Sequence, residues 1–163
     1  QVLDELRQTL AALPPGAIPS SEAAASGAGT LPTPTPGASP TEIYLQAFGA
    51  YSAGQLEQAA AGFESFLNTF PGNDYAGNAH YWLGECYFAQ KQFDRAVQEF
   101  ELVAERHADG GRAPDALLKS AAAWLQLGYK DRAQEAISTL RRRFPDSQAA
   151  RKSLQGINVS NGN

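Results

Sequence analysis

The apolar residues of this 163-residue chain recur at the spacing of helices. Between Tyr81 and Val103 they form two runs in which apolar side chains return every three or four residues, and the polar pair Lys91-Gln92 separates the runs. We find no stretch in which apolar and polar residues alternate as they do in a half-buried strand. The pattern therefore predicts an all-α chain whose units are helical hairpins.

The hairpin pattern repeats with a period of 37 residues, so that residues of similar size share columns. The columns are Ala47, Gly84 and Ala121; Tyr51, Phe88 and Leu125; Ala59, Ala96 and Ala133; Phe63, Phe100 and Ile137; and Phe66, Val103 and Leu140. A fixed period of this length indicates stacked supersecondary units, and the small residues would let helix backbones approach closely. We expect repeats at about 40–76, 77–113 and 114–150 and a capping helix at 147–157.

Turn residues mark where the helices should begin and end. Gly54 and Gly128 fall at the break inside the first and third hairpins, where a helix end often needs a positive φ. Asp74 and Asp146 follow prolines between hairpins, and we expect their side chains to cap the next helices.

Three segments outside the repeats have a different composition. Residues 14–40 contain seven of the ten prolines and one charged residue, which predicts a disordered linker, and we expect 158–163 to be a flexible tail. Residues 1–13 space their leucines as a coiled coil does, at Leu3, Leu6, Leu10 and Leu13. Two heptads are marginal in water, so oligomerisation would need a longer coil upstream.

The middle repeat resembles the tetratricopeptide signature, with Leu83, Gly84 and Tyr87 as L-G-x-x-Y, followed by Ala96 and Phe100. The phrase AHYWLGECYF and the order of coil, Pro-rich linker and repeats further resemble the periplasmic cell-division coordinators of the Tol-Pal system, the YbgF/CpoB family. This resemblance covers residues 41–157.

The resemblance implies an α-solenoid of three tetratricopeptide repeats in a periplasmic adaptor that is not an enzyme. It implies binding to TolA, coordination of peptidoglycan synthesis with outer-membrane constriction during division, and a trimer formed only through the upstream coiled coil. A peptidoglycan synthase complex is a further candidate partner. The alternative is another periplasmic tetratricopeptide adaptor, such as an outer-membrane assembly lipoprotein.

Charge is distributed unevenly along the chain. The net charge of −4 suggests no nucleic-acid partner. The chain contains no run of eighteen apolar residues, so we predict no integral membrane segment. Residues 41–110 carry ten Asp or Glu against three Lys or Arg, whereas 111–163 carry four against nine. This asymmetry is either a solvated face or a bipolar docking surface. The run from Arg141 to Arg143 either binds phosphate groups or complements a helix C-terminus.

Candidate chemistry is sparse, and we predict no catalytic, cofactor-binding or metal-binding residue. The single cysteine, Cys86, has no histidine at a spacing that would activate it, so a buried thiol is expected. His80 and His107 lack further metal ligands nearby in the sequence. The carboxylates from Glu99 to Glu105 are expected on an outward helix face.

The predicted function depends on a groove lined by the first helix of each hairpin. Its positions, read from the register, are Thr41, Tyr44, Phe48, Tyr51 and Ser52; Asn78, Tyr81, Glu85, Phe88 and Ala89; and Asp115, Leu118, Ala122, Leu125 and Gln126. The set is aromatic and apolar with few charges, which suits an amphipathic helix or an extended peptide. Tyr44 and Phe48 are expected to be the most accessible, because no hairpin precedes them. The opposing interpretation buries Tyr81 and Phe88 between hairpins.

Overall fold

The structure is a computed structural model that describes residues 38–156. Within this range the chain forms seven α-helices and one short 3-10 helix, which confirms the all-α prediction. The helices are α2 (Pro40–Ser52), α3 (Leu56–Thr69), α4 (Ala76–Ala89), α5 (Phe93–Arg106), α6 (Ala113–Gln126), α7 (Lys130–Arg143) and α8 (Gln148–Gly156), with η1 (Ala108–Gly110) between α5 and α6. The predicted coiled coil at 1–13, almost all of the linker and the tail at 158–163 lie outside the described residues.

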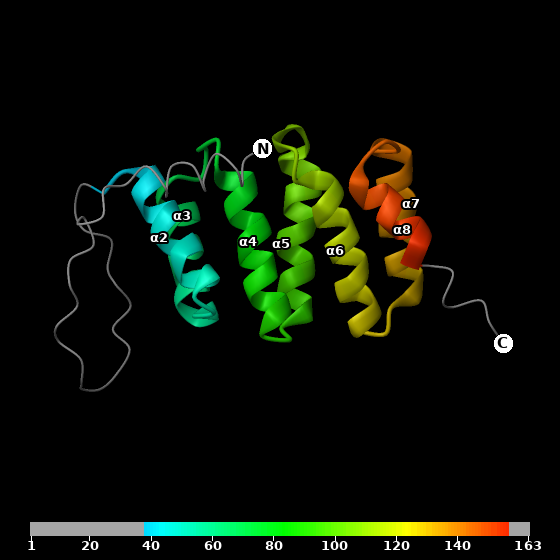
Figure 1. The fold of residues 1–163 in the computed structure, drawn as a ribbon, viewed down its shortest axis with the longest axis horizontal. Coiled ribbons are helices and arrows are strands. Elements are labelled where there is room, and N and C mark those ends of the chain that lie inside the picture. The colour runs from blue at the N-terminus through cyan, green and yellow to red at the C-terminus, as the bar shows by residue number, and fades with distance from the viewer. Residues whose placement is uncertain (1–37, 157–163) are drawn as a thin grey trace. The chain divides into compact units, whose positions relative to one another are not determined.

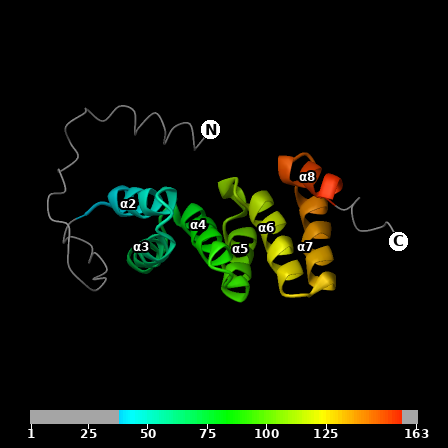
Figure 2. The ribbon, with the colours of Figure 1, turned by 60° about the horizontal axis from the view of Figure 1, so that its bottom comes forward.

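The helices pack as antiparallel neighbours in chain order, α2 on α3, α3 on α4 and onward to α8 (Figure 1). Helix α2 also contacts α4, and α6 contacts α8, so the first helices of successive hairpins share one layer. A second view shows α2 and α3 of the first hairpin one above the other, with α8 lying against the last hairpin (Figure 2). Three hairpins and a capping helix therefore form an α-solenoid, as the repeat predicted.

The 37-residue period is visible in the helix boundaries. The first helices of the hairpins end at Ser52, Ala89 and Gln126, and the second helices begin at Leu56, Phe93 and Lys130. Both sets are spaced by 37 residues, because the same turn joins the two helices of each hairpin.

That turn has a left-handed residue at the same place in each repeat, namely Gly54 (φ 75°), Lys91 (φ 61°) and Gly128 (φ 84°). In the first hairpin the Gly54 amide donates to the Tyr51 carbonyl at 3.0 Å, and the next amide donates back to Ala50 at 2.9 Å. These two bonds form a Schellman motif, which satisfies carbonyls at the helix end. The prediction for the two glycines is confirmed, and the middle hairpin uses a lysine instead.

The helix N-caps differ from the prediction. Helix α4 has no side-chain cap, and Asn73 Oδ1 accepts from the Tyr75 amide at 2.9 Å in the turn before the helix. Ser147, and not Asp146, caps α8, since its Oγ accepts from the Ala150 amide at 3.1 Å. The prediction that Asp74 and Asp146 cap these helices is therefore wrong.

A capping box, unrecognised in the sequence, begins α2 inside what was predicted as linker. The Ser39 amide donates to Glu42 Oε2 at 2.7 Å, and the Glu42 amide donates to Ser39 Oγ at 3.3 Å. The hydrogen bonds to Ser39 lower the pKa of Glu42, because they favour the charged carboxylate. Pro40 occupies the first turn of the helix, where its missing N–H has no cost.

Hydrogen bonds between hairpins also follow the period. Tyr87 on α4 donates its hydroxyl to Glu64 on α3, and Trp124 on α6 donates its indole N–H to Glu101 on α5 at 3.1 Å. Both members of the second pair lie 37 residues after the first. Arg95 adds to the first pair, with its guanidinium 4.0 Å above the Tyr87 ring and 3.0 Å from Glu64. Glu101 therefore connects two hairpins and does not simply face outward as predicted.

Close helix packing inside the middle hairpin depends on Gly84. A Cβ atom at this position would lie 2.7 Å from Phe100 Cε1 and 2.9 Å from its Cδ1. Phe100 is fully buried, so the ring has little room to move. The small-residue column of the sequence thus marks the place where a helix backbone meets a large side chain.

We predict that Gly84→Ala lowers the free energy of unfolding by roughly 1–3 kcal/mol, because the added methyl group overpacks the contact with Phe100. Gly49→Ala is the matched control, since it is also a helical glycine but has no atom within 4 Å of the place that the added methyl group would occupy. That control should gain about 0.5–1 kcal/mol from helix propensity alone. Urea denaturation of both variants measures the difference, and changes of the same sign would contradict the packing assignment.

Lys91→Gly should stabilise the protein. The left-handed conformation costs a residue with a Cβ about 1–2 kcal/mol, and the greater freedom of glycine in the unfolded chain offsets about 0.5–1 kcal/mol of this gain. We expect a net increase of roughly 0.5–1 kcal/mol in the free energy of unfolding.

The reverse substitutions, Gly54→Ala and Gly128→Ala, provide the comparison, because no atom lies within 4 Å to add a steric term. Both should destabilise the fold through the backbone conformation alone. A Lys91→Gly variant that is less stable than the native protein would show that the lysine side chain supplies a compensating contact.

Candidate peptide-binding groove

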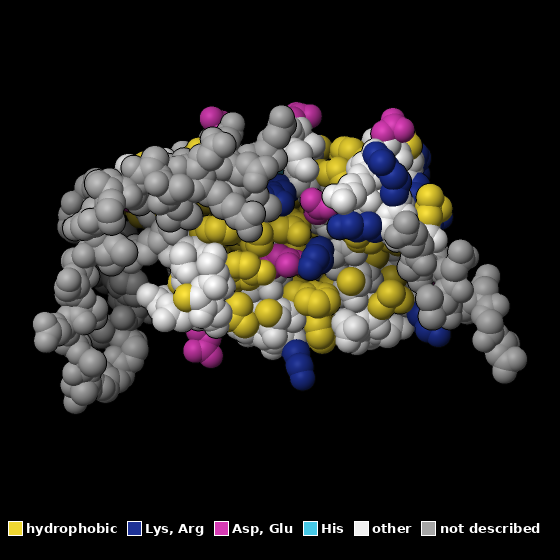
Figure 3. All heavy atoms as spheres, in the orientation of Figure 1, with side chains coloured by type: hydrophobic (Ala, Val, Ile, Leu, Met, Phe, Trp, Pro, Cys, Tyr) yellow, Lys and Arg dark blue, Asp and Glu magenta, His cyan; other side chains and the backbone are white. Residues whose placement is uncertain are grey.

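The fifteen predicted groove residues lie on α2, α4 and α6, but the structure gives them different exposures. Tyr44 and Tyr81 are buried. Leu125 is 56% exposed, and Thr41, Ser52, Ala89 and Gln126 are also exposed. The other eight are half-buried: Phe48, Tyr51, Asn78, Glu85, Phe88, Asp115, Leu118 and Ala122. The face seen in Figure 3 has hydrophobic side chains gathered over the middle of the helix array, with a few acidic and basic side chains among them.

Tyr44 is a core residue, contrary to the prediction that it would be accessible. It is 2% exposed, because its ring contacts Phe63 and Phe66 edge-on, each at 5.7 Å between centroids. Tyr75, in the connection before α4, stacks on it at 5.3 Å. Burial raises the pKa of Tyr44 to about 12. The prediction was wrong because it asked only whether a preceding hairpin would cover Tyr44. In the structure α3 of the same hairpin and the connection to α4 cover this ring.

Three aromatic rings join α2 to α4 at the start of the groove. The Trp82 ring lies 5.1 Å from Phe48 and 5.0 Å from Tyr51. Trp82 is itself buried, while Phe48 and Tyr51 remain half-buried and can contact a ligand. Burial, with a smaller contribution from the Glu85 charge, raises the pKa of Tyr51, so the ring stays neutral at physiological pH.

An ion pair crosses from α4 to α6 in the middle of the groove. Lys119 Nζ lies 2.9 Å from the Glu85 carboxylate, and the same ammonium lies 5.7 Å from the centroid of Phe88. Glu85 is mostly buried, and the lysine neutralises it there. Glu85 was predicted as a groove residue, whereas Lys119 was missed.

Arg112, the residue before α6, reaches back over α4. Its Nε donates to Asn78 Oδ1 at 3.1 Å, and its guanidinium carbon lies 5.0 Å from the Tyr81 ring centroid and 5.3 Å from that of Trp82. Burial raises the pKa of Tyr81 well above its usual range, and the Arg112 charge partly opposes this. Sequence reasoning missed Arg112 because it precedes the helix whose register was used to assign the groove.

The remaining candidate residues have structural surroundings. Cys86 is fully buried, and burial raises the pKa of its thiol to about 12, which keeps it protonated. The rings of His80 and His107 lie 5.6 Å apart between centroids and are tilted against one another, and His80 Nδ1 lies 2.6 Å from Glu99 Oε2. Glu99 therefore pairs with a histidine and does not face outward as predicted. Residues 38–156 contain no group of three or more side chains placed to hold a metal ion.

Two of the three consecutive arginines at the end of α7 tie helices together. Arg141 donates to Oγ and to the carbonyl of Ser153 on α8, both at 3.3 Å. Arg143 donates to the Ala104 carbonyl on α5 at 3.1 Å. Only Arg142 of this run is both exposed and without a side-chain hydrogen bond to the described residues. Arg141 and Arg143 therefore stabilise the packing of α7 through hydrogen bonds to uncharged oxygens.

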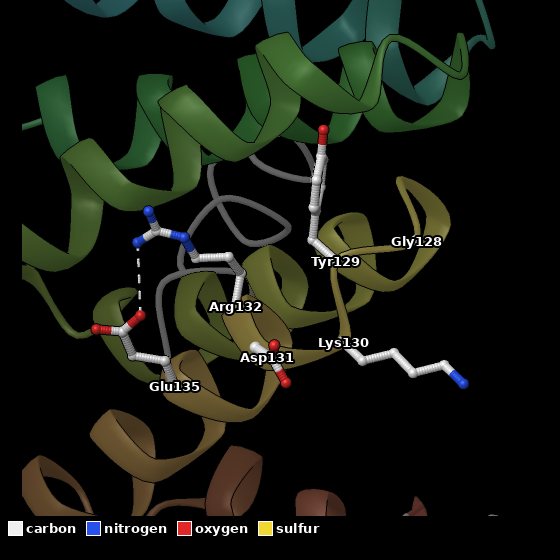
Figure 4. A pocket seen from close by; sticks show the side chains of 6 residues that line it. All are labelled: Gly128, Tyr129, Lys130, Asp131, Arg132 and Glu135. Carbon is white, nitrogen blue, oxygen red and sulfur yellow. Dashed lines mark ion pairs between the residues drawn. The ribbon is translucent and has the colours of Figure 1, made fainter.

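A second surface feature, at the start of α7, offers less for binding. The depression is lined by Gly128, Tyr129, Lys130, Asp131, Arg132 and Glu135. Arg132 and Glu135 face one another across 3.5 Å, with Tyr129 directed away from them and Lys130 extending to the other side (Figure 4). All six residues come from one short stretch of chain, and the ion pair is largely exposed. This arrangement provides no convergent set of polar groups.

Comparison with known proteins agrees with the repeat geometry. The tetratricopeptide repeat family matches residues 50–113 and, separately, residues 115–147. This part of the chain belongs to the tetratricopeptide repeat family. The N-terminal domain of stress-induced protein-1 from C. elegans has the same fold, with a TM-score of 0.61 over 71% of this chain and 92% of that chain at 18% identity.

Two curated relatives, both named cell division coordinator CpoB, come from Pseudomonas putida strain KT2440 and from Pseudomonas putida. Each is 40% identical over 47 residues, which cover 29% of this chain and 18% of the relative. The tetratricopeptide repeat domain is therefore CpoB-like, although the match spans less than a fifth of the length of those relatives.

The stability of the protein should depend on pH through His107, which lies in the connection between α5 and Arg112. Its column in the repeat holds Phe70 and Phe144, so an ionisable ring occupies a place where the other repeats have phenylalanine. Burial, together with the charges of His80 and Arg106, lowers the pKa of His107. The unfolded chain then binds a proton more readily than the folded one, and stability should fall as the pH decreases below about 6.5.

Urea denaturation of the native protein and of His107→Phe and His107→Gln at pH 7.5 and 5.5 measures this effect. Both variants should show a smaller loss of unfolding free energy between the two pH values. Equal losses in all three proteins would assign the pH dependence to other groups.

Proposed function

We propose that this protein is a non-enzymatic adaptor of the Tol-Pal system in the periplasm, where it binds TolA and coordinates peptidoglycan synthesis with outer-membrane constriction during cell division. The similarity of the repeat domain to the cell division coordinator CpoB carries this proposal. The part of the chain between 38 and 156 supports binding more than catalysis, because its cysteine is buried and one of its two histidines, His80, is paired with Glu99. None of the described helices is both long and apolar enough to cross a membrane.

The partner segment would bind on the layer formed by α2, α4 and α6. Half-buried Phe48, Tyr51, Phe88 and Leu118 and exposed Leu125 supply apolar surface along this layer. Such surfaces accept the apolar face of a helix or the side chains of an extended peptide. Rings that are already fixed by packing lose little conformational freedom on binding, which favours them as anchors.

The double substitution Phe48→Ala/Leu125→Ala should weaken binding of the periplasmic region of TolA by at least about tenfold, or 1.4 kcal/mol. Tyr44 is left unchanged in this experiment, because its side chain is part of the core. Isothermal titration calorimetry with the full chain measures the affinity, and circular dichroism checks that helicity is retained.

Tyr129→Ala/Leu154→Ala is the matched control, since it also removes one aromatic residue and one leucine, both 57% exposed, from outside the groove. It should change the affinity less than twofold. Arg142→Glu tests the basic end of the domain, which is the run from Arg141 to Arg143. This substitution should also change the affinity little at physiological salt, where exposed charges are screened. Loss of binding in Arg142→Glu with unchanged binding in the groove variant would place the partner at the basic end.

A further inference from the structure

We propose that the Arg112 end of the groove binds a carboxylate side chain within the partner segment, so that the groove selects peptides with an acidic residue at a set distance from an apolar one. This inference rests on the proposed function, in which the groove holds a partner peptide. It specifies which chemical group of the peptide is recognised and at which end of the groove that group binds.

Arg112 is held in place by α4 before any ligand arrives. Its Nε donates to Asn78, and its guanidinium lies over the rings of Tyr81 and Trp82. Contacts with three side chains of another helix remove most of the rotamer freedom of a long side chain. A ligand that uses this guanidinium therefore bears little of the entropic cost of ordering it.

The positive charge of Arg112 has no carboxylate partner within residues 38–156, where no acidic oxygen lies within 4 Å of it. The other groove cation, Lys119, differs in this respect, because it pairs with Glu85. Asp115 lies near enough to Tyr81 to oppose the effect of Arg112 on that hydroxyl, but it forms no ion pair with the guanidinium. Arg112 is thus the groove cation that is available to a charged ligand.

The geometry of a guanidinium matches a carboxylate. Arginine has five N–H donors in a planar fork, and the described residues engage only the Nε–H of Arg112. The two terminal amino groups can donate to both oxygens of one carboxylate, which is a stronger and more directional contact than a single ammonium makes. This contact uses donors that Asn78 does not occupy.

The length of α4 sets the distance between the acidic and apolar contacts. Asn78 and Phe88 are ten residues apart on this helix, or about 15 Å. An extended peptide covers that distance in four or five residues at about 3.3 Å each. A segment lying along α4 should therefore carry its acidic residue four or five positions from the side chain that contacts Phe88 and Leu125.

Selection of random 12-residue peptides displayed on phage, with the full chain as bait, tests this inference without assuming the identity of the partner. The peptides are fused at their C-terminus, so no free terminal carboxylate takes part. Parallel selections use Arg112→Gln and, as a matched control, Arg132→Gln, which removes an arginine with an exposed side chain from outside the groove. Arg112→Lys is included because it keeps the charge but not the planar fork, and circular dichroism confirms the fold of each bait.

The native chain and Arg132→Gln should enrich Asp or Glu four or five positions from an aromatic or aliphatic residue, and Arg112→Gln should not. For one enriched peptide made synthetically with an amidated C-terminus, Asp→Asn should weaken binding at least fivefold to the native chain and less than twofold to Arg112→Gln. If Arg112→Gln does not fold, the loss of affinity caused by Asp→Asn in the peptide must be smaller for Arg112→Lys than for the native chain.

Peptides that need Phe48 and Leu125 but show no acidic preference, or the same preference with Arg112→Gln, would overturn the inference and leave the groove function intact. If no enriched peptide loses binding to the Phe48→Ala/Leu125→Ala variant, both the groove function and the inference are overturned. Self-association of the full chain that Arg112→Gln abolishes would replace the peptide with a second copy as the occupant.

Discussion

The contact between the Phe100 ring and the bare backbone of Gly84 sets the distance between α4 and α5, and the rest of the array depends on it. An atom added at Gly84 would lie 2.7 Å from the ring, so the two helices are already as close as a glycine allows. The first hairpin reaches the same close approach differently, because there a Cβ on Gly62 would lie 2.8 Å from Ala47. Since each hairpin rests on the next, the thickness of one hairpin determines where the following first helix lies.

Polar contacts then fix the rotation of one hairpin against the next. The pairs Glu64–Tyr87 and Glu101–Trp124 recur at the period of the repeat and join a second helix to the following first helix. In these pairs a half-buried carboxylate accepts from an aromatic donor, so both the hydrogen bond and ring packing depend on the same orientation. At the end of α7, Arg141 connects this helix to α8, and Arg143 connects it to α5.

The groove results from this stacking of the hairpins. First helices held side by side present the same face, and where their rings are only half covered an apolar surface remains. Lys119 and Arg112 cross between helices on this surface, but only Lys119 meets a carboxylate. The proposed adaptor function and the proposed acidic specificity therefore use side chains that the array itself immobilises.

The sequence by itself determined the helical hairpins, their period of 37 residues and their close packing at Gly84, because these depend on local periodicity and on residue size. It also identified the groove helices, since Phe48, Phe88, Leu118 and Leu125 lie at positions read directly from the register. Only the tertiary structure decided which groove residues are accessible. Tyr44 is covered by Tyr75 from one connection, and Tyr81 is covered by Arg112 from the next. The two contacts lie 37 residues apart, but Tyr75 and Arg112 precede the helices from whose register the groove was predicted. Contacts between side chains of different hairpins, such as Glu85 with Lys119, exist only once the hairpins have stacked.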